Sequence, residues 1–199
     1  MTPTFISTNP NMNKRLHVVD DFFEDPYAVR KFALEQEYFD DPGYIGNRTR
    51  KQFFIPGTRE AFEKIMGVKI TGWTMEDNWE KYGMNGRFQY NVAGQSLVYH
   101  CDDQKWAAMI YLTPDAPVSC GTSFYAHKKT RIRHNGQEGI MDCFSHGTFV
   151  DPTPYETVDV VGNVFNRLVI FDAGLIHAAS GYFGSNKENC RLWQMFFFD

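Results

Sequence analysis

The sequence predicts a mainly β protein, a barrel or sandwich of short strands with two supporting N-terminal helices. From residue 69 onward, short apolar and aromatic runs alternate with turn signals made of glycine, proline and asparagine, which is typical of an all-β domain. Aromatic residues make up 16% of the 199 residues and include 18 phenylalanines. This composition favours packed strands over a helical bundle.

The first expected helix follows a short strand. Residues 16–23 read as that strand, ending in an acidic turn. Asp25 followed by Pro26 is a typical helix start, with an acidic N-cap and a proline at the first helical position. The apolar spacing that follows predicts a helix over about 26–38.

A second helix is expected after an irregular stretch. Residues 40–56 contain proline, glycine, asparagine and arginine, and they are expected to lack regular structure. Thr58 is expected to cap a helix whose apolar residues share one face, and Gly67 is expected to stop it.

The β core is expected to include a tight hairpin. Asn85-Gly86 is the preferred dipeptide of a type I′ hairpin turn. Beyond it, strand candidates are bounded by glycine, proline and asparagine. The expected strands are 87–93, the segment bearing His100, 106–112, 122–127, 158–161, 167–172 and 191–198.

One connection interrupts this pattern of short strands and turns. Residues 128–157 carry a basic cluster at their start, and a long connection in a compact domain is usually functional or mobile. We expect an insertion over the mouth of the barrel, with the basic cluster as a solvated face or, alternatively, a grip for an anionic or peptide substrate. Without repeats or linkers, the chain is expected to form a single domain over 1–199, with a helical front at 16–68 and a β core at about 69–198.

Composition excludes several classes of function. The net charge is −4 without an acidic or basic block, which argues against nucleic acid as an obligate partner. No apolar run reaches membrane-spanning length, and the N-terminus lacks a signal-peptide pattern, so a cytoplasmic location is expected. The four cysteines show no C-x-x-C spacing, so reduced, mostly buried thiols are expected rather than a zinc ribbon.

Two histidines and one aspartate form the candidate metal site. His100 and Asp102 are two residues apart in a predicted strand, where alternate residues project from the same face; Asp103 does not share that face and is expected to be solvent-facing or structural. His177 lies among small residues that permit close approach and is the third candidate ligand, although a buried histidine bonded to backbone is the alternative. Two histidines and one carboxylate are the ligand set of non-haem Fe(II) oxygenases.

Arg191 opens the final strand in apolar surroundings. A guanidinium is costly to bury unless a carboxylate meets it. One possibility is an internal ion pair, with Asp172 as the candidate partner. The other is a dicarboxylate cosubstrate, because arginine binds carboxylate through two parallel hydrogen bonds.

These features resemble the Fe(II)- and 2-oxoglutarate-dependent dioxygenases, and within them the prolyl-4-hydroxylase-like branch. The resemblance covers roughly residues 85–198. The family motif of His-x-Asp, a distal His and a basic residue on the last strand falls on His100, Asp102, His177 and Arg191. The resemblance implies a double-stranded β-helix, also called a jelly roll, with Fe(II) at one end and 2-oxoglutarate as cosubstrate.

The resemblance also implies two cosubstrate-binding tyrosines. Tyr90 stands ten residues before the first ligand, at the position of a family tyrosine that meets the cosubstrate. Tyr111 lies in a strand motif whose tyrosine helps the basic residue hold the distal carboxylate. Core packing is the alternative for both, because tyrosine is common in strands. The chain departs from relatives that follow the arginine with x-Ser, since Trp193 stands where that serine would be.

The implied reaction couples oxidative decarboxylation of 2-oxoglutarate, yielding succinate and CO₂, to hydroxylation of a substrate C–H bond with O₂. The substrate is left open between a peptidyl residue and a small metabolite. Two alternatives stay open: a cupin-like metalloprotein that does not use 2-oxoglutarate, and a catalytically silent jelly-roll binding protein. The aromatic first helix is compatible with a homodimer.

Overall fold

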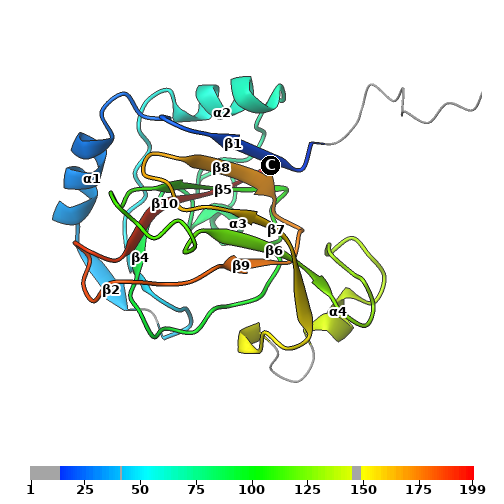
Figure 1. Cartoon of the computed structure of the whole chain (residues 1–199). Helices are drawn as coiled ribbons and strands as arrows, with labels where there is room; N and C mark the ends of the chain where they lie inside the picture. Colours follow the sequence, from blue (N-terminus) through cyan, green and yellow to red (C-terminus); the bar gives the residue numbers. More distant parts are fainter. Residues whose placement is uncertain (1–13, 41, 145–148) are drawn as a thin grey trace, which may run out of the picture.

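Two antiparallel sheets make up the fold (Figure 1). The computed structural model describes residues 14–40, 42–144 and 149–199. The large sheet has seven strands in the order β1-β8-β5-β10-β4-β3-β2, and the small sheet has three in the order β7-β6-β9. All of these strand pairs are antiparallel. The mainly β class predicted from the sequence is therefore confirmed.

The elements have the following bounds. The large sheet contains β1 (Leu16–Val19), β2 (Tyr38–Asp40), β3 (Asn47–Thr49), β4 (Phe88–Asn91), β5 (Trp106–Tyr111), β8 (Leu168–Asp172) and β10 (Arg191–Phe198). The small sheet contains β6 (Thr122–His127), β7 (Tyr155–Val161) and β9 (His177–Ala179). The helices are α1 (Pro26–Glu35), α2 (Thr58–Met66), α3 (Trp79–Tyr82) and α4 (Ile140–Cys143). In the described parts of the chain, no helix combines the length and the apolar character needed to cross a membrane.

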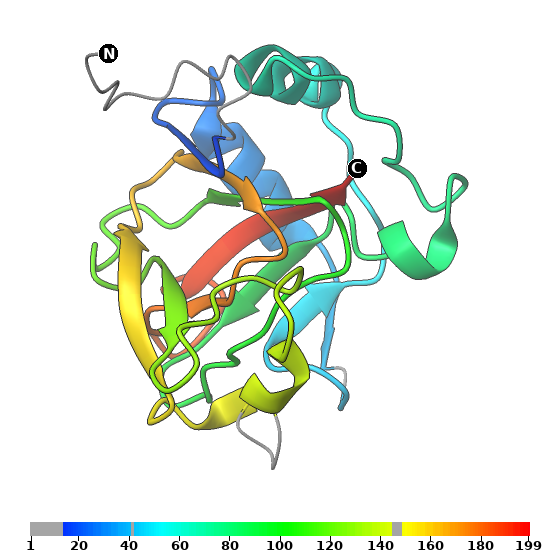
Figure 2. The same ribbon diagram turned by 90° about the vertical axis from the view of Figure 1, so that its right-hand side faces the viewer.

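Strand β10 separates two parts of the core. Because side chains alternate along a strand, Phe196 and Phe198 pack on one face with Phe62 of α2, whereas Trp193 and Met195 pack on the other face toward the small sheet. Figure 2 shows α1 (blue) on one side of β10 (red) and β6 and β7 (green to yellow) on the other. The two N-terminal helices therefore cover the outer face of the large sheet, as expected.

The start of α1 agrees with the sequence, but its end does not. The side chain of Asp25 accepts a hydrogen bond of 2.9 Å from the backbone N–H of Ala28, which is the expected N-cap. The helix ends at Glu35 instead of residue 38. Gln36 is extended, because the chain must enter β2 at Tyr38.

The second helix begins one residue earlier than predicted. Gly57 is its N-cap, in a left-handed conformation with φ of 87°, and no side chain caps the helix. Thr58 is therefore the first helical residue, so its assignment as cap was wrong. Gly67 ends the helix with φ of 72°, which confirms the expected stop.

Asn85-Gly86 does not form the predicted hairpin turn. A type I′ turn needs positive φ at both central residues, and Asn85 has none; helix α3 precedes it instead of a strand. The buried amide of Asn85 donates to the carbonyl of Trp73 and accepts a 3.1 Å bond from the N–H of Phe197. Its role is to satisfy distant backbone groups, which the local dipeptide pattern does not reveal.

The stretch expected to be irregular contains one short strand, β3, and starts at the last residue of another, β2. Strands β2 and β3 pair with each other and extend the large sheet beyond β4. Each has only three residues, too few for an apolar period to be visible. This hairpin places Arg48 beside the cavity described below.

Candidate metal centre

His100 and His177 face each other across an antiparallel bridge. The N–H of His100 donates to the carbonyl of His177 at 3.1 Å, and the N–H of His177 donates back at 2.9 Å. Directly opposed residues project to the same side, so the two imidazole centroids are 4.3 Å apart. His100 makes this isolated bridge instead of lying in the regular strand predicted from the sequence.

Both imidazoles keep Nε2 available. Nδ1 of His100 bonds the carbonyl of Val98 at 3.0 Å, and Nδ1 of His177 bonds the carbonyl of Leu175 at 2.8 Å. A carbonyl only accepts, so we assign the hydrogen of each neutral ring to Nδ1 and a lone pair to Nε2. Hydrogen bonds of this kind orient histidine ligands in metal sites.

Asp102 completes the cluster. Its Oδ1 is 3.5 Å from Nε2 of His100, and its Oδ2 is 3.4 Å from Nε2 of His177. Both separations are long for hydrogen bonds, and Oδ2 is buried without a hydrogen-bond partner among the described residues. One ligand atom from each of the three residues lies within 4.8 Å of the others. A carboxylate that faces two imidazole Nε2 atoms, with one of its oxygens orphaned, fits a metal ion. Asp103 is exposed.

The local electrostatics favour the ligand forms of these groups. Burial and the neighbouring His177 lower the pKa of His100, which keeps its imidazole neutral at neutral pH. Burial tends to raise the pKa of Asp102, but the positive charge of His100 and His177 in their protonated forms and the charge of Arg48 act against it, and the net shift is downward. Neutral imidazoles and an ionised carboxylate are the forms that bind metal ions.

A cavity of about 590 Å³ adjoins the triad. The side chain of His100 is 38% exposed and that of His177 is 7% exposed, so the accessible side of the triad lies at His100. The cavity runs between the two sheets. Its wall includes Arg48, Gln89, Thr122, Tyr182, Arg191 and Trp193.

Arg191 is 2% exposed and meets no carboxylate within ion-pair distance in the described parts of the chain. Its Nε donates to the carbonyl of Cys120 at 3.1 Å, and one Nη donates to the carbonyl of Gly121 at 3.2 Å. Asp172, the partner considered from the sequence, pairs with His134 at 2.9 Å instead. The possibility of an internal ion pair between Arg191 and Asp172 is therefore wrong.

Tyr111 and Tyr90 lie in different surroundings. Tyr111 is fully buried, 5.3 Å from the guanidinium of Arg191 by ring centroid, and its hydroxyl is 2.8 Å from that of Thr122. Burial raises its pKa. Tyr90 pairs with Leu192 on the helix-facing side of the large sheet and packs against Tyr38 at 5.0 Å. The structure brings Tyr111 to Arg191 through Thr122, and it does not bring Tyr90 to the cavity.

Comparison with family models matches residues 5–188 to a family described as a family of unknown function, DUF6445. The chain belongs to this family. A comparison with curated proteins gives no significant match.

Solved structures resemble this DUF6445 chain over nearly its whole length. HygX from Streptomyces hygroscopicus, solved with nickel, 2-oxoglutarate and hygromycin B, has a TM-score of 0.63 at 12% identity, covering 92% of this chain and 82% of HygX. A Trichoplax adhaerens prolyl hydroxylase, solved with a peptide of hypoxia inducible factor, has a TM-score of 0.53 at 12% identity, covering 96% of this chain and 86% of the hydroxylase.

A third solved structure agrees with these two. AviO1 from Streptomyces viridochromogenes Tue57 has a TM-score of 0.53 at 13% identity, covering 95% of this chain and 91% of AviO1. At such low identities the similarity shows the fold. The DUF6445 chain has the double-stranded β-helix of 2-oxoglutarate oxygenases, as the sequence resemblance implied.

The structure adds site residues that the sequence analysis missed. Tyr182 lines the cavity, 6.0 Å from the guanidinium of Arg191 by ring centroid, and its hydroxyl has no hydrogen-bond partner among the described residues. Burial raises its pKa, although Arg191 and Arg48 act against this effect. Tyr182 lies outside any strand, so no alternation pattern pointed to it; Thr122 opens a predicted strand and was detectable in principle.

The described residues of the 128–157 range do not line the cavity at the candidate site, where an insertion over the barrel mouth was expected. Residues from 155 onward belong to β7. Tyr155 packs behind the site, parallel to Tyr99 with ring centroids 5.0 Å apart. The loop before β3, including Tyr44, borders the cavity instead.

Proposed function

We propose that this protein is an Fe(II)- and 2-oxoglutarate-dependent dioxygenase that hydroxylates a C–H bond of a substrate yet to be identified, a peptidyl residue or a small metabolite, with release of succinate and CO₂. His100, Asp102 and His177 would hold the metal. The fold supports this proposal, as does the ligand chemistry of the triad.

The observation that carries the proposal is Arg191 in the same cavity as the triad. A guanidinium this deeply buried is costly without a counter-charge, and the described residues offer it carbonyls and a hydroxyl but no carboxylate. A dicarboxylate spanning from the triad to Arg191 would supply that charge. 2-Oxoglutarate has the required two ends, one to chelate a metal and one to meet an arginine.

The chain's own residues would orient this cosubstrate. Arg191 would bind its distal carboxylate, together with the hydroxyl of Thr122, which lies 3.3 Å from Nη2 of Arg191. Tyr111 would hold that hydroxyl in place from behind. Tyr182, a protonated phenol on the cavity wall, would donate a further hydrogen bond. Tyr90 has no part in this proposal because its side chain faces the helices.

The bound metal and cosubstrate would supply the oxidation itself. Fe(II) with 2-oxoglutarate would supply the oxidising chemistry, so no side chain is needed as general acid or base. His100, Asp102 and His177 would hold the metal through two imidazoles and one carboxylate, a ligand set that leaves coordination positions open for cosubstrate and O₂. Trp193 and Met195 would shield the cavity from water.

Succinate formation tests the proposal. Purified protein with Fe(II), 2-oxoglutarate and O₂ is expected to release succinate, and omission of either Fe(II) or 2-oxoglutarate is expected to abolish the release. Metal binding without 2-oxoglutarate binding would favour the cupin-like alternative. Binding of both without turnover, whatever candidate substrate is added, would favour the silent binding protein.

A further inference from the structure

Part of the connection between β6 and β7 runs beside one ligand-bearing segment. Residues 133–135, which we call the clamp, lie along residues 174–176, which lead directly into His177. The N–H of Asn135 donates to the carbonyl of Gly174 at 2.8 Å, and a second backbone bond of 2.8 Å returns from segment 174–176 to the clamp. The clamp thus pairs with this turn as a short strand would.

The same clamp reaches the other ligand-bearing segment. The side-chain amide of Asn135 donates to the backbone carbonyl of Asp102 at 3.1 Å. The N–H of Asp102 donates to the carbonyl of Ala173 at 2.9 Å. Both backbone polar groups of Asp102 are therefore tied to the segment before His177, one directly and one through Asn135.

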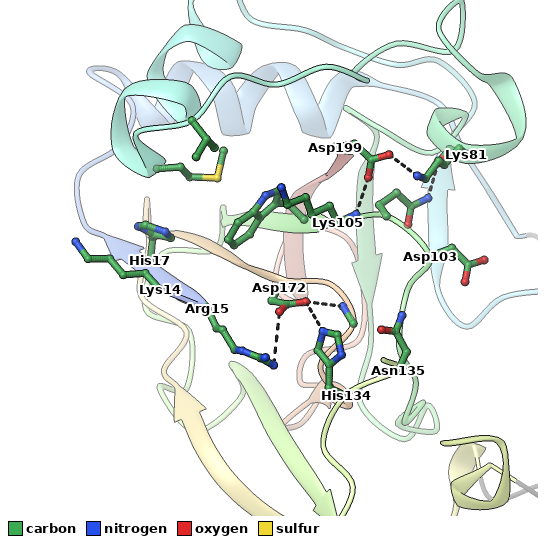
Figure 3. Close-up of a pocket in the computed structure, with 15 residues that line it drawn as sticks. Lys14, Arg15, His17, Lys81, Asp103, Lys105, His134, Asn135, Asp172 and Asp199 are labelled. Carbon is green, nitrogen blue, oxygen red and sulfur yellow. Dashed lines mark hydrogen bonds and ion pairs between the residues drawn. The ribbon is translucent and has the colours of Figure 1, made fainter. Parts of the chain in front are cut away.

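His134 anchors the clamp to the start of that segment. Its Nδ1 accepts from the N–H of Gly136 at 2.9 Å, so the ring hydrogen lies on Nε2, which donates to Oδ1 of Asp172 at 2.9 Å. The same oxygen accepts from the N–H of Gly174 at 3.1 Å. Figure 3 shows His134 and Arg15 both directed at the Asp172 carboxylate.

The approach of the clamp is close enough to require glycine on the opposite side. A β-carbon at Gly174 would collide with the side chains of His134 and Asn135. The side chains of His134 and Asn135 therefore pack directly against the backbone of Gly174, at a distance that leaves no room for a β-carbon.

We propose that Asn135 and His134 are positioning residues of the metal centre, an inference that rests on the proposed function. They fix the distance between Asp102 and His177, which come from segments more than seventy positions apart in the sequence. Neither touches the metal position, so they act through the ligands' backbone. Outer partners of this kind typically change metal affinity about 10–100-fold.

Titration of Ni(II) into the metal-free full-length protein tests the proposal. Asn135→Asp keeps the size of the side chain but replaces the amide donor with an acceptor facing the Asp102 carbonyl. It is expected to raise the Kd for Ni(II) roughly 10–100-fold, with Asn135→Ala and His134→Phe changing it in the same direction. Glu138→Gln, an exposed position in the same connection, is the matched control and should bind as wild type.

Thermal unfolding of the metal-free proteins separates positioning from a general structural role. The proposal expects the metal-free Tm of Asn135→Asp to stay at the wild-type value while Ni(II) affinity falls. An unchanged Kd in Asn135→Asp and His134→Phe would overturn the inference, as would a Kd change matched by lost metal-free stability. If the wild type itself fails to bind Ni(II), the proposed function falls, and this inference with it.

Discussion

The guanidinium of Arg191 lies over the ring of Trp193, 4.2 Å from its centroid. The two residues are two apart on β10 and share its cavity-facing side. A cation–π contact in a buried setting stabilises the guanidinium by about 2 kcal/mol, so this tryptophan holds Arg191 in place without neutralising its charge.

Replacement of Arg191 is predicted to abolish cosubstrate binding selectively. Arg191→Lys keeps the charge but loses the planar fork that binds carboxylate through two hydrogen bonds, and Arg191→Met loses both. We expect a loss of roughly 2–5 kcal/mol in 2-oxoglutarate binding free energy for Arg191→Met, measured by calorimetry on metal-loaded protein. Ni(II) affinity should be unchanged in both variants. Wild-type 2-oxoglutarate affinity in Arg191→Met would assign the arginine a structural role.

The two tyrosines near Arg191 are predicted to behave differently. Tyr182→Phe removes an unpartnered hydroxyl from the cavity wall. Because a hydrogen bond to a charged group is worth about 1.5–3 kcal/mol, the Kd of this variant for 2-oxoglutarate should rise roughly 10–150-fold. The free energy of unfolding should change little. Tyr111→Phe breaks the bond to Thr122 and should cost about 1 kcal/mol of unfolding free energy, with a smaller effect on 2-oxoglutarate. The reverse order of effects on binding would contradict this assignment.

The neighbouring aspartates offer a matched pair for the metal site. Asp102→Ala is expected to weaken Ni(II) binding by more than the 10–100-fold typical of outer partners, because a direct ligand is lost. Asp103→Ala, at an exposed position, should retain wild-type affinity. Full metal affinity in Asp102→Ala would refute the ligand assignment.

The helix-facing core is predicted to be separable from the site. Phe62 is fully buried and contacts the rings of Trp73, Phe196 and Phe198 at centroid distances of 5.1–5.8 Å. Phe62→Ala should lower the free energy of unfolding by about 3–5 kcal/mol, measured by denaturant titration. Ni(II) affinity below the unfolding transition should not change, since the triad lies across the large sheet from this cluster. A proportionate loss of affinity would show that the two regions are coupled.

Asp77 is predicted to make part of the stability depend on pH. Hydrogen bonds from the N–H groups of Thr74 and Trp73 lower its pKa below the usual 3.8. The ionised form is therefore favoured by folding, so its contribution is complete above the unfolded pKa and is lost as pH falls through the lower folded pKa. The stability difference between wild type and Asp77→Asn should be largest near neutral pH and should vanish in acid. A difference independent of pH would contradict this reasoning.

The pairing of His100 with Asp102 in the candidate metal site was predictable because its signal is local, whereas His177 was placed beside them by the family resemblance; their role as metal ligands stays a prediction. The two-residue spacing of His100 and Asp102 selects one face of an extended segment, and the structure keeps that relation although the segment forms only an isolated bridge. The burial of Arg191 was predictable from the apolar sequence of its strand and is confirmed by the structure, whereas its part in binding a cosubstrate stays a prediction. The strand bounds at 122–127 and 191–198 were also reproduced by the structure.

What the sequence did not reveal depends on pairing between distant strands. Tyr90 was placed by its distance from His100, but its face is set by the register that opposes it to Leu192. Asn85 was read as a turn residue, whereas its amide binds backbone groups 12 and 112 positions away. Tyr182 reaches the cavity from an irregular segment, where no periodicity indicates direction.

Binding of 2-oxoglutarate is the most direct test of the central claim, because it does not require the substrate. Calorimetric titration of 2-oxoglutarate into the protein without O₂, with and without Fe(II), measures whether the triad and Arg191 form one site. We predict saturable binding that depends on the metal and is lost in Arg191→Met. Absence of binding to protein that has demonstrably taken up Fe(II) would contradict the account.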